Sequence, residues 1–174
     1  AESPGGRNIP APLWHGHEDL RGKTILLHAE QGLGDTLQFC RYVTLVQARG
    51  AIVILEVDAA LKSLLASLAG VTKIVVFGDA LPPCDYHCPL LSLPLAFATT
   101  LETIPAGIPY LYAEPAAIAH WQKKLGQKRR PRIGTAWSGN PAQAKARNRS
   151  LPVVRMEPLP AVPPQSVCLK KESR

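Results

Sequence analysis

Long hydrophobic runs are absent from this chain of 174 residues, and no stretch approaches the ~20 consecutive apolar residues that a membrane-spanning helix needs. The first residues also lack the basic and apolar regions of a signal peptide, so the expected location is cytoplasmic. Charged residues make up only 19% of the chain and hydrophobic residues 46%, a balance that argues against disorder. The composition therefore predicts a globular protein with a buried core.

Cysteine is scarce, and its spacing is not that of a disulfide framework. We expect free thiols at all four positions, which are Cys40, Cys84, Cys88 and Cys168. A metal site could be built from Cys84, His87 and Cys88, but zinc usually takes four ligands and no second cluster of ligands exists. The sequence therefore predicts no metal.

Acidic residues are nearly missing from the last part of the chain. Residues 1–120 contain seven Lys and Arg against eleven Asp and Glu, whereas residues 121–174 contain thirteen against two. Such a basic segment could meet nucleic acid, a phosphorylated ligand or an acidic partner, or it could be a solvated face. Because no aromatic residues interleave the basic clusters, we expect no nucleic-acid partner.

Short apolar runs alternate with longer helical runs, with strands expected at 23–29, 51–57 and 73–77 and helices at 36–49 and 59–69. Strands separated in this way must run parallel with right-handed crossovers. The pattern predicts an α/β fold with a Rossmann-like, doubly wound parallel sheet.

Further elements are weaker in pattern. We expect a short fourth strand and a loop or irregular helix within 86–95, a possible strand at 108–112, a helix at 116–125 and a strand at 132–137. The last of these would open a second, incomplete α/β unit. The expected organisation is an N-terminal extension at 1–21, a Rossmann-like domain at 22–128 and the beginning of a second domain at 129–174.

A turn rich in glycine joins the first expected strand to the first helix. Gly32 and Gly34 permit backbone angles that a side chain would forbid and let another group approach the main chain. Asp35 falls at or next to the helix N-terminus, where two interpretations stay open. It either caps the helix by accepting from free N–H groups, or it acts as a base or ligand contact at the carboxyl end of a parallel strand.

Several segments, in order and spacing along nearly the whole chain, resemble the glycosyltransferase-like region that follows tetratricopeptide repeats in many bacterial proteins. They are Trp14–Gly16, Gly22–Tyr42, Asp85–Pro94, Thr103–Pro105, Pro109–Leu111, Trp137–Asn140 and Arg149–Ser150. That family is similar to heptosyltransferases and, more distantly, to O-linked N-acetylglucosamine transferases. The resemblance implies a GT-B fold, in which one Rossmann-like domain holds the acceptor and a second binds a nucleotide-sugar.

The resemblance also implies roles for particular residues. Asp35 takes the position of the proposed catalytic base, with substrate contacts from Gly32, Leu33, Gly34 and Gln38. The donor diphosphate would be bound by Ser138, Gly139, Asn140 and Arg149. The expected substrates are a nucleotide-sugar and a glycan or protein acceptor, with no metal cofactor.

The chain departs from the family pattern in its second domain. Most of a donor-side domain is missing, and residues 141–149 lack the Asn-Asp pair that relatives carry before Arg-Ser. We therefore expect the chain to be inactive on its own and to act as the acceptor-side half of a longer enzyme. The alternatives are a non-catalytic module that binds a glycan or peptide, and an assembly domain that pairs with another copy. A dinucleotide-binding oxidoreductase is excluded because Leu37 stands where its third glycine would fall.

Overall fold

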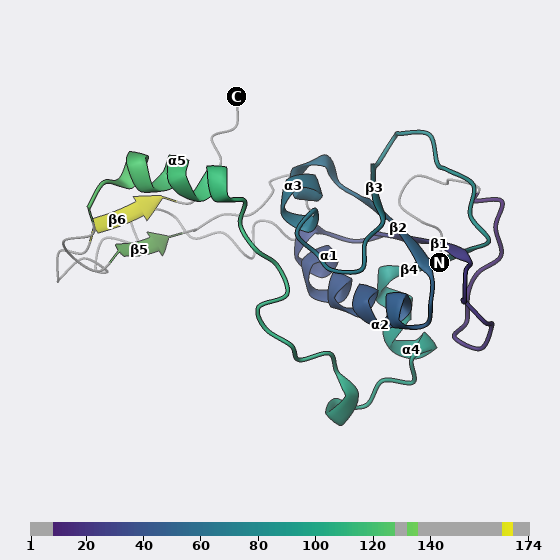
Figure 1. Ribbon diagram of the computed structural model, residues 1–174. Helices are drawn as coiled ribbons and strands as arrows, with labels where there is room; N and C mark the ends of the chain where they lie inside the picture. The colour runs from purple at the N-terminus through teal and green to yellow at the C-terminus, as the bar shows by residue number, and fades with distance from the viewer. Residues whose placement is uncertain (1–8, 128–131, 136–164, 169–174) are drawn as a thin grey trace, which may run out of the picture. The chain divides into compact units, whose positions relative to one another are not determined.

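The computed structural model describes residues 9–127, 132–135 and 165–168 (Figure 1). The chain divides into two compact units, residues 1–118 and residues 119–174.

The first unit is built on a sheet of four parallel strands in the order β3-β2-β1-β4. The strands are β1 (Thr24–His28), β2 (Ile52–Val57), β3 (Lys73–Val76) and β4 (Tyr86–Pro89). The α/β, Rossmann-like prediction is confirmed, including its fourth strand. Because β4 pairs with β1 on the side opposite β2, the chain reverses its winding direction between β1 and β4.

Helices follow the first, second and fourth strands (Figure 1). They are α1 (Leu33–Phe39) and α2 (Val43–Ala48), joined by a 3-10 turn, then α3 (Lys62–Leu65) and α4 (Leu93–Ala96). The expected first helix is thus an almost continuous α1–α2 rod that starts three residues earlier than predicted. It ends as expected at Gly50, whose φ of +83° favours glycine.

All these helices pack on one face of the sheet. Alternate strand residues point toward them, among them Ile25, Leu27, Val53, Leu55 and Cys88, each with 0% of its surface exposed. The helices contribute apolar side chains to the same cluster, namely Val43, Val46, Leu61, Leu65 and Leu93. This shared cluster is the main core of the first unit.

The other face of the sheet carries a smaller core. Leu26, Ile54 and Val75 are buried there, with Leu81 and Cys84 packed against them. Leu81 and Cys84 belong to the connection from β3 to β4, which must cross this face if the crossover is right-handed. The connection contains no helix, so the doubly wound order is kept while an extended segment takes the place of a covering helix.

The N-terminal segment adds to the open edge of β4. The N–H of Trp14 donates to the carbonyl of His87 at 2.8 Å, and the N–H of His87 donates to the carbonyl of Pro12 at 3.0 Å. The Trp14 side chain is buried and meets the ring of Phe97 edge-on at 5.5 Å. Trp14 is therefore part of the core of the first unit, whereas Pro12 and Leu13 remain exposed.

The segment after α4 differs from its predicted structure. The prediction of a strand at 108–112 is wrong, because this segment makes no sheet pairing and packs instead against the helical layer, with the Tyr110 hydroxyl donating to the carbonyl of Leu37.

The second unit contains β5 (Arg132–Thr135) and β6 (Gln165–Cys168), which pair in parallel. Helix α5 (Pro115–Leu125) spans the boundary between the units.

Two glycines with nearly the same backbone angle provide a test of the packing. Gly16 (φ +99°) and Gly78 (φ +100°) both adopt a left-handed conformation, but a Cβ at Gly16 would collide with the carbonyl of Ala96, whereas a Cβ at Gly78 would meet open space. We expect Gly78→Ala to lower the free energy of unfolding by about 1–2 kcal/mol, the cost of the angle alone. Gly16→Ala should cost about 2 kcal/mol more, because the backbone must also shift. Urea denaturation measures both, and equal losses would contradict the close approach of residue 16 to α4.

Candidate functional site

The glycine turn lies at the carboxyl end of β1, where α1 begins. Gly32 is the residue before the helix, and its N–H donates to Asp35 Oδ2 at 3.1 Å. Asp35 therefore caps the helix from inside its first turn, as one of the two interpretations predicted. Its side chain is half-buried, so the carboxylate also reaches the surface of the site.

The conformational role predicted for the two glycines is wrong. Gly32 is extended, with φ −67° and ψ 170°, and Gly34 lies within the helix, so neither needs a left-handed angle. A Cβ placed at Gly34 would meet nothing within 4 Å, so this position faces open space. The helix start is consequently open to an approaching group, with the exposed side chain of Leu33 beside it.

The position of this turn in the sheet is the one at which open α/β folds bind ligands. β1 pairs with β2 on one side and β4 on the other, so the carboxyl end of β1 lies at the point where the winding reverses. At such a switch point the connections leave in opposite directions and open a crevice. Asp35 and the open surface at Gly34 stand at this point.

A pair of histidines lies beside the switch point on the second face of the sheet. His28 Nε2 and His87 Nδ1 are 3.1 Å apart and share one hydrogen bond, whose donor depends on the tautomer. His28 is 2% exposed, and its burial and the neighbouring His87 lower its pKa to about 4. The buried Glu56 is its register partner on β2. The sequence pattern did not identify either histidine as part of this site. The only indication of such a role is that each histidine lies near the end of a strand.

Glu30 is a second carboxylate at this end of β1, and no sequence pattern pointed to it. Its Oε2 atom is buried and has no hydrogen-bond partner within the described part of the chain. Burial raises the pKa of this carboxyl. The carboxyl end of β1 thus carries two acidic side chains. Asp35 caps the helix, whereas the Oε2 atom of Glu30 has no hydrogen-bond partner among the described residues.

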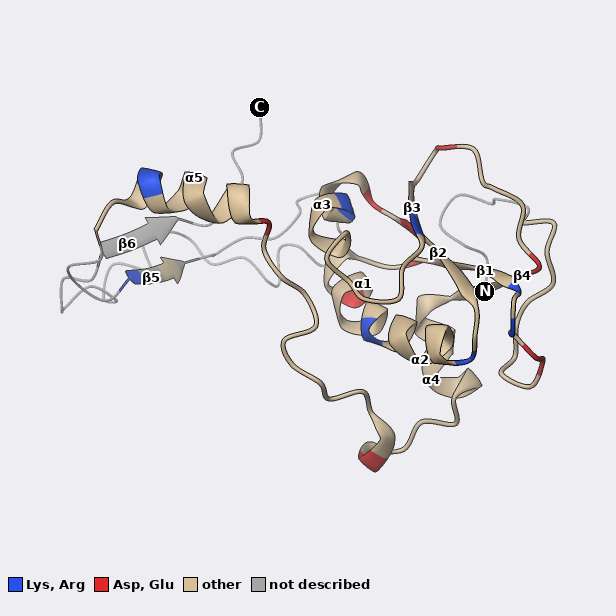
Figure 2. Cartoon of the chain, viewed as in Figure 1, with Lys and Arg blue, Asp and Glu red and all other residues tan. Residues whose placement is uncertain are grey.

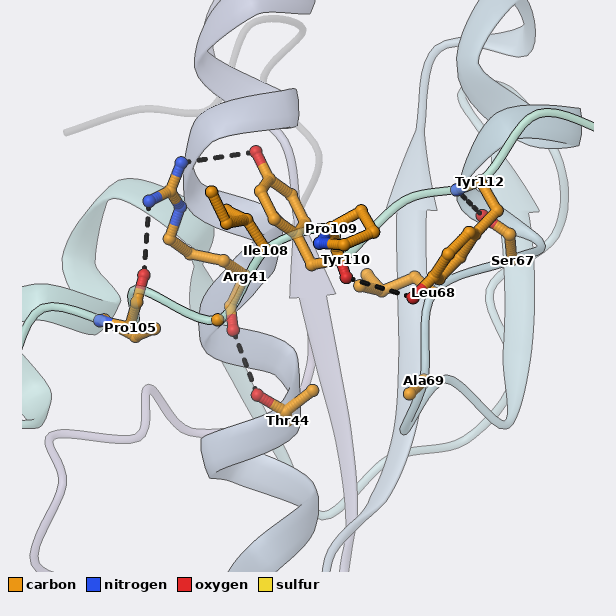
Figure 3. A pocket seen from close by; sticks show the side chains of 11 residues that line it. Arg41, Thr44, Ser67, Leu68, Ala69, Pro105, Ile108, Pro109, Tyr110 and Tyr112 are labelled. Atoms are coloured by element: carbon orange, nitrogen blue, oxygen red, sulfur yellow. Dashed lines mark hydrogen bonds between the residues drawn. The ribbon is translucent and has the colours of Figure 1, made fainter.

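A segment after α4 crosses the outer side of the α1–α2 rod. Arg41, in the 3-10 turn Cys40–Tyr42, holds it by donating from Nη1 to the carbonyl of Pro105 at 3.2 Å and from Nη2 to the hydroxyl of Tyr110 at 3.3 Å (Figure 3). The guanidinium carbon also lies 4.9 Å from the centre of the Tyr110 ring. We call residues 99–112 the strap. Between it, the rod and the end of α3 lies a cavity of about 370 Å³, shown in Figure 3.

A second cavity, of about 490 Å³, adjoins the same arginine. It is lined by residues of the rod, of α4 and of the strap, and it includes the predicted substrate contact Gln38. Asp35 and Gln38 are one helical turn apart and so share a face of α1. Asp35 and Gln38 therefore lie on the same side of α1, although only Gln38 lines the cavity.

The predicted donor contacts Ser138, Gly139, Asn140 and Arg149 lie outside the described residues. Cys84, His87 and Cys88 do not converge, because His87 faces His28 whereas Cys88 is buried in the opposite core. No group of three His, Cys, Asp or Glu side chains suited to a metal occurs in the described residues. Burial raises the pKa of Cys40 to about 11 and that of Cys88 to about 12, so both stay protonated at neutral pH and make poor nucleophiles.

Charged positions of the first unit lie mainly in loops and near the ends of its helices and strands (Figure 2). None of the helices among the described residues is both long enough and apolar enough to cross a membrane. The free thiols expected at Cys40, Cys84 and Cys88 are confirmed.

The sheet order defines an α/β, Rossmann-like protein, and its glycine turn lies at the carboxyl end of β1, where folds of this class bind ligands. The chain is similar to Protein FlbA of Caulobacter vibrioides, with 27% identity over 172 aligned residues that cover 87% of this chain. It spans 28% of the length of that relative. No family model matches the sequence, and no solved structure matches it.

The depressed pKa of His28 predicts a pH-dependent stability. The folded chain keeps His28 neutral down to about pH 4, whereas the unfolded chain takes up a proton near pH 6.5. The contribution of His28 to the free energy of unfolding should therefore be constant above pH 7 and fall by up to about 3 kcal/mol as the pH drops from 6.5 to 4. Urea denaturation across this range measures the effect. His28→Gln should reduce the fall in this window and leave the part due to His87, whose pKa burial also lowers, while the exposed His17→Gln should leave the curve unchanged. Equal curves for the parent chain and His28→Gln would contradict the assignment.

Proposed function

We propose that this chain is the acceptor-side half of a GT-B glycosyltransferase, which transfers a sugar from a nucleotide-sugar to a hydroxyl group. The observation that carries the proposal is the position of Asp35 and the open glycine turn at the switch point between β1 and β4. Sites of this kind bind ligands in parallel α/β folds. The order of segments that resembles bacterial glycosyltransferase-like regions supplies the reaction class.

In the proposed reaction Asp35 acts as general base. Its carboxylate takes the proton of the acceptor hydroxyl while that oxygen forms a bond to the anomeric carbon of the donor sugar. The bond from this carbon to the diphosphate breaks, and its electron pair leaves with the nucleotide diphosphate. Attack opposite the leaving group inverts the anomeric centre. The open surface at Gly34 lets the acceptor approach the start of α1, and Gln38 extends the contact by one turn.

The donor is proposed to bind in the second unit, through the backbone and side chains of residues 138–140 and Arg149. Free N–H groups and a guanidinium suit the oxygens of a diphosphate. No metal is part of the proposal. Residues 129–174 are proposed to belong to the donor-side domain.

A substitution that keeps the helix cap tests the role of Asp35. Asp35→Asn retains an oxygen to accept from the N–H of Gly32 but removes the base, so transfer by the protein in its full natural length should fall by about 10²–10⁴-fold. The assay follows labelled sugar from ADP-heptose or UDP-N-acetylglucosamine to hydroxyl acceptors.

Asp58 provides the matched control. It also follows a strand of the sheet and caps a helical turn, accepting from the N–H of Ala60 at 2.8 Å. Asp58→Asn should leave transfer within about twofold of the parent, since general-base losses are far larger. Similar turnover in the parent and Asp35→Asn would remove Asp35 from the role of base.

A second candidate is a non-catalytic module that keeps the acceptor site to bind a glycan or peptide. Its supporting observation is that the Asp35 carboxylate already has a structural partner in the Gly32 N–H. Three aliphatic side chains, Leu95, Leu101 and Ile108, are also at least 80% exposed and are available for contact with a partner.

Calorimetry separates the two candidates. The binding module predicts heat on adding a glycan or peptide acceptor and none on adding a nucleotide-sugar, in the protein at full natural length. The transferase predicts heat from both. Saturable binding of UDP-N-acetylglucosamine or ADP-heptose would therefore rule out the non-catalytic candidate.

A further inference from the structure

Arg41 lies in the wall between the two cavities beside the α1–α2 rod. Its Nε donates to the carbonyl of Gln38 at 2.8 Å, and its two terminal nitrogens donate to Pro105 and Tyr110. All three acceptors are neutral, and no carboxylate pairs with Arg41 within the described ranges. The half-buried guanidinium has five N–H groups, so these bonds leave two of them for another acceptor. A positive charge set into a cavity wall without a counter-ion attracts an anion.

The larger cavity has the chemistry of a small-molecule site. Most of its wall is apolar, formed by Phe39, Tyr42, Pro94, Leu101 and Ile104. Its volume of about 490 Å³ falls within the range of ligand pockets, which are mainly apolar with a few polar groups that fix orientation. Besides Arg41, the polar groups are the Gln38 amide and the hydroxyls of Tyr42, Thr99 and Thr100. The Thr100 hydroxyl pairs with that of Thr103, whereas the Gln38 and Thr99 side chains have no hydrogen bond to the described residues.

The charge and the apolar wall together specify the ligand. We propose that this cavity binds a small amphiphilic anion, with a carboxylate or phosphate head on Arg41 and an apolar body against Phe39, Leu101 and Ile104. A neutral ligand would leave the guanidinium uncompensated, and a cation would be repelled by it. The inference stands on the cavity itself and does not depend on the proposed sugar transfer.

Arg41 also has a mechanical role that must be separated from ligand binding. It ties the strap to the rod, so its loss could open the cavity without any ligand being involved. Tyr110→Phe provides the separation, because it removes the bonds of the Tyr110 hydroxyl to Arg41 and to the carbonyl of Leu37 while keeping the charge. A purely mechanical role predicts that both changes act alike.

Three probes with the same eight-carbon tail test the head group. Octanoate, octyl phosphate and octylammonium are titrated below their micelle concentrations into the ¹⁵N-labelled chain, and backbone amide shifts are followed. We expect saturable shifts at Gln38 and Thr99–Leu101 with both anions, and binding of octylammonium weaker by at least about tenfold. Tighter binding of octyl phosphate than of octanoate, or the reverse, identifies which head group the site prefers.

Two matched pairs of variants locate the site. Arg41→Gln should weaken octanoate binding about tenfold, whereas Arg49→Gln, whose arginine lies over the ring of Phe97, should not. Leu101→Glu places a negative charge in the cavity wall and should abolish binding of the anions, whereas Leu95→Glu should leave it intact. The second pair is matched because Leu101 is 85% and Leu95 86% exposed, so neither change disturbs the core.

Several outcomes would overturn the proposal. They are octylammonium binding as tightly as octanoate, Leu95→Glu acting as strongly as Leu101→Glu, or no saturable shift at millimolar probe. Equal loss of binding in Tyr110→Phe and Arg41→Gln would assign Arg41 to holding the strap alone. Because no readout involves sugar transfer, these results are independent of the test of Asp35.

Discussion

The pairing of β1 with a strand on each side is the constraint on which the rest of the first unit depends. β2 lies on one side and β4 on the other, and all three strands run in the same direction. Because parallel strands need crossovers, the chain must leave the carboxyl end of β1 over one face and return to β4 over the opposite face. The start of α1 therefore lies at the point in the sheet where the winding direction reverses. The glycine turn, Asp35 and the histidine pair are placed by this topology.

The α1–α2 rod positions the side chains of the candidate site. One side of the rod supplies Val43 and Val46 to the main core, which fixes its orientation against the sheet. The other side faces outward with Asp35, Gln38 and Arg41 at intervals of three residues, so the three side chains follow one another along a helix face. A carboxylate, an amide and a guanidinium are thus held by a well-packed element. The strap completes the cavities by crossing this outer side and bonding to Arg41.

The second face of the sheet is less apolar than the first. It buries His28 and Glu56 beside a small cluster of Leu26, Ile54 and Val75. A buried imidazole is tolerated when it is neutral and bonded, and His28 satisfies both conditions through His87. An extended crossover covers this face in place of a helix, and the strand order is nevertheless that of a doubly wound sheet.

The sequence predicts the α/β class, the four strands of the first sheet and the place of the glycine turn, because buried parallel strands such as 52–57 are nearly continuous apolar runs and helices end at glycines such as Gly50. It did not reveal the strap, since residues 108–112 resemble a strand locally and their packing on the rod depends on partners about seventy residues away. The sequence did not reveal the pairing of His28 with His87 either, because the two residues are far apart in the sequence. Only the tertiary structure decided these contacts, because register and crossover direction bring together residues that no local pattern connects.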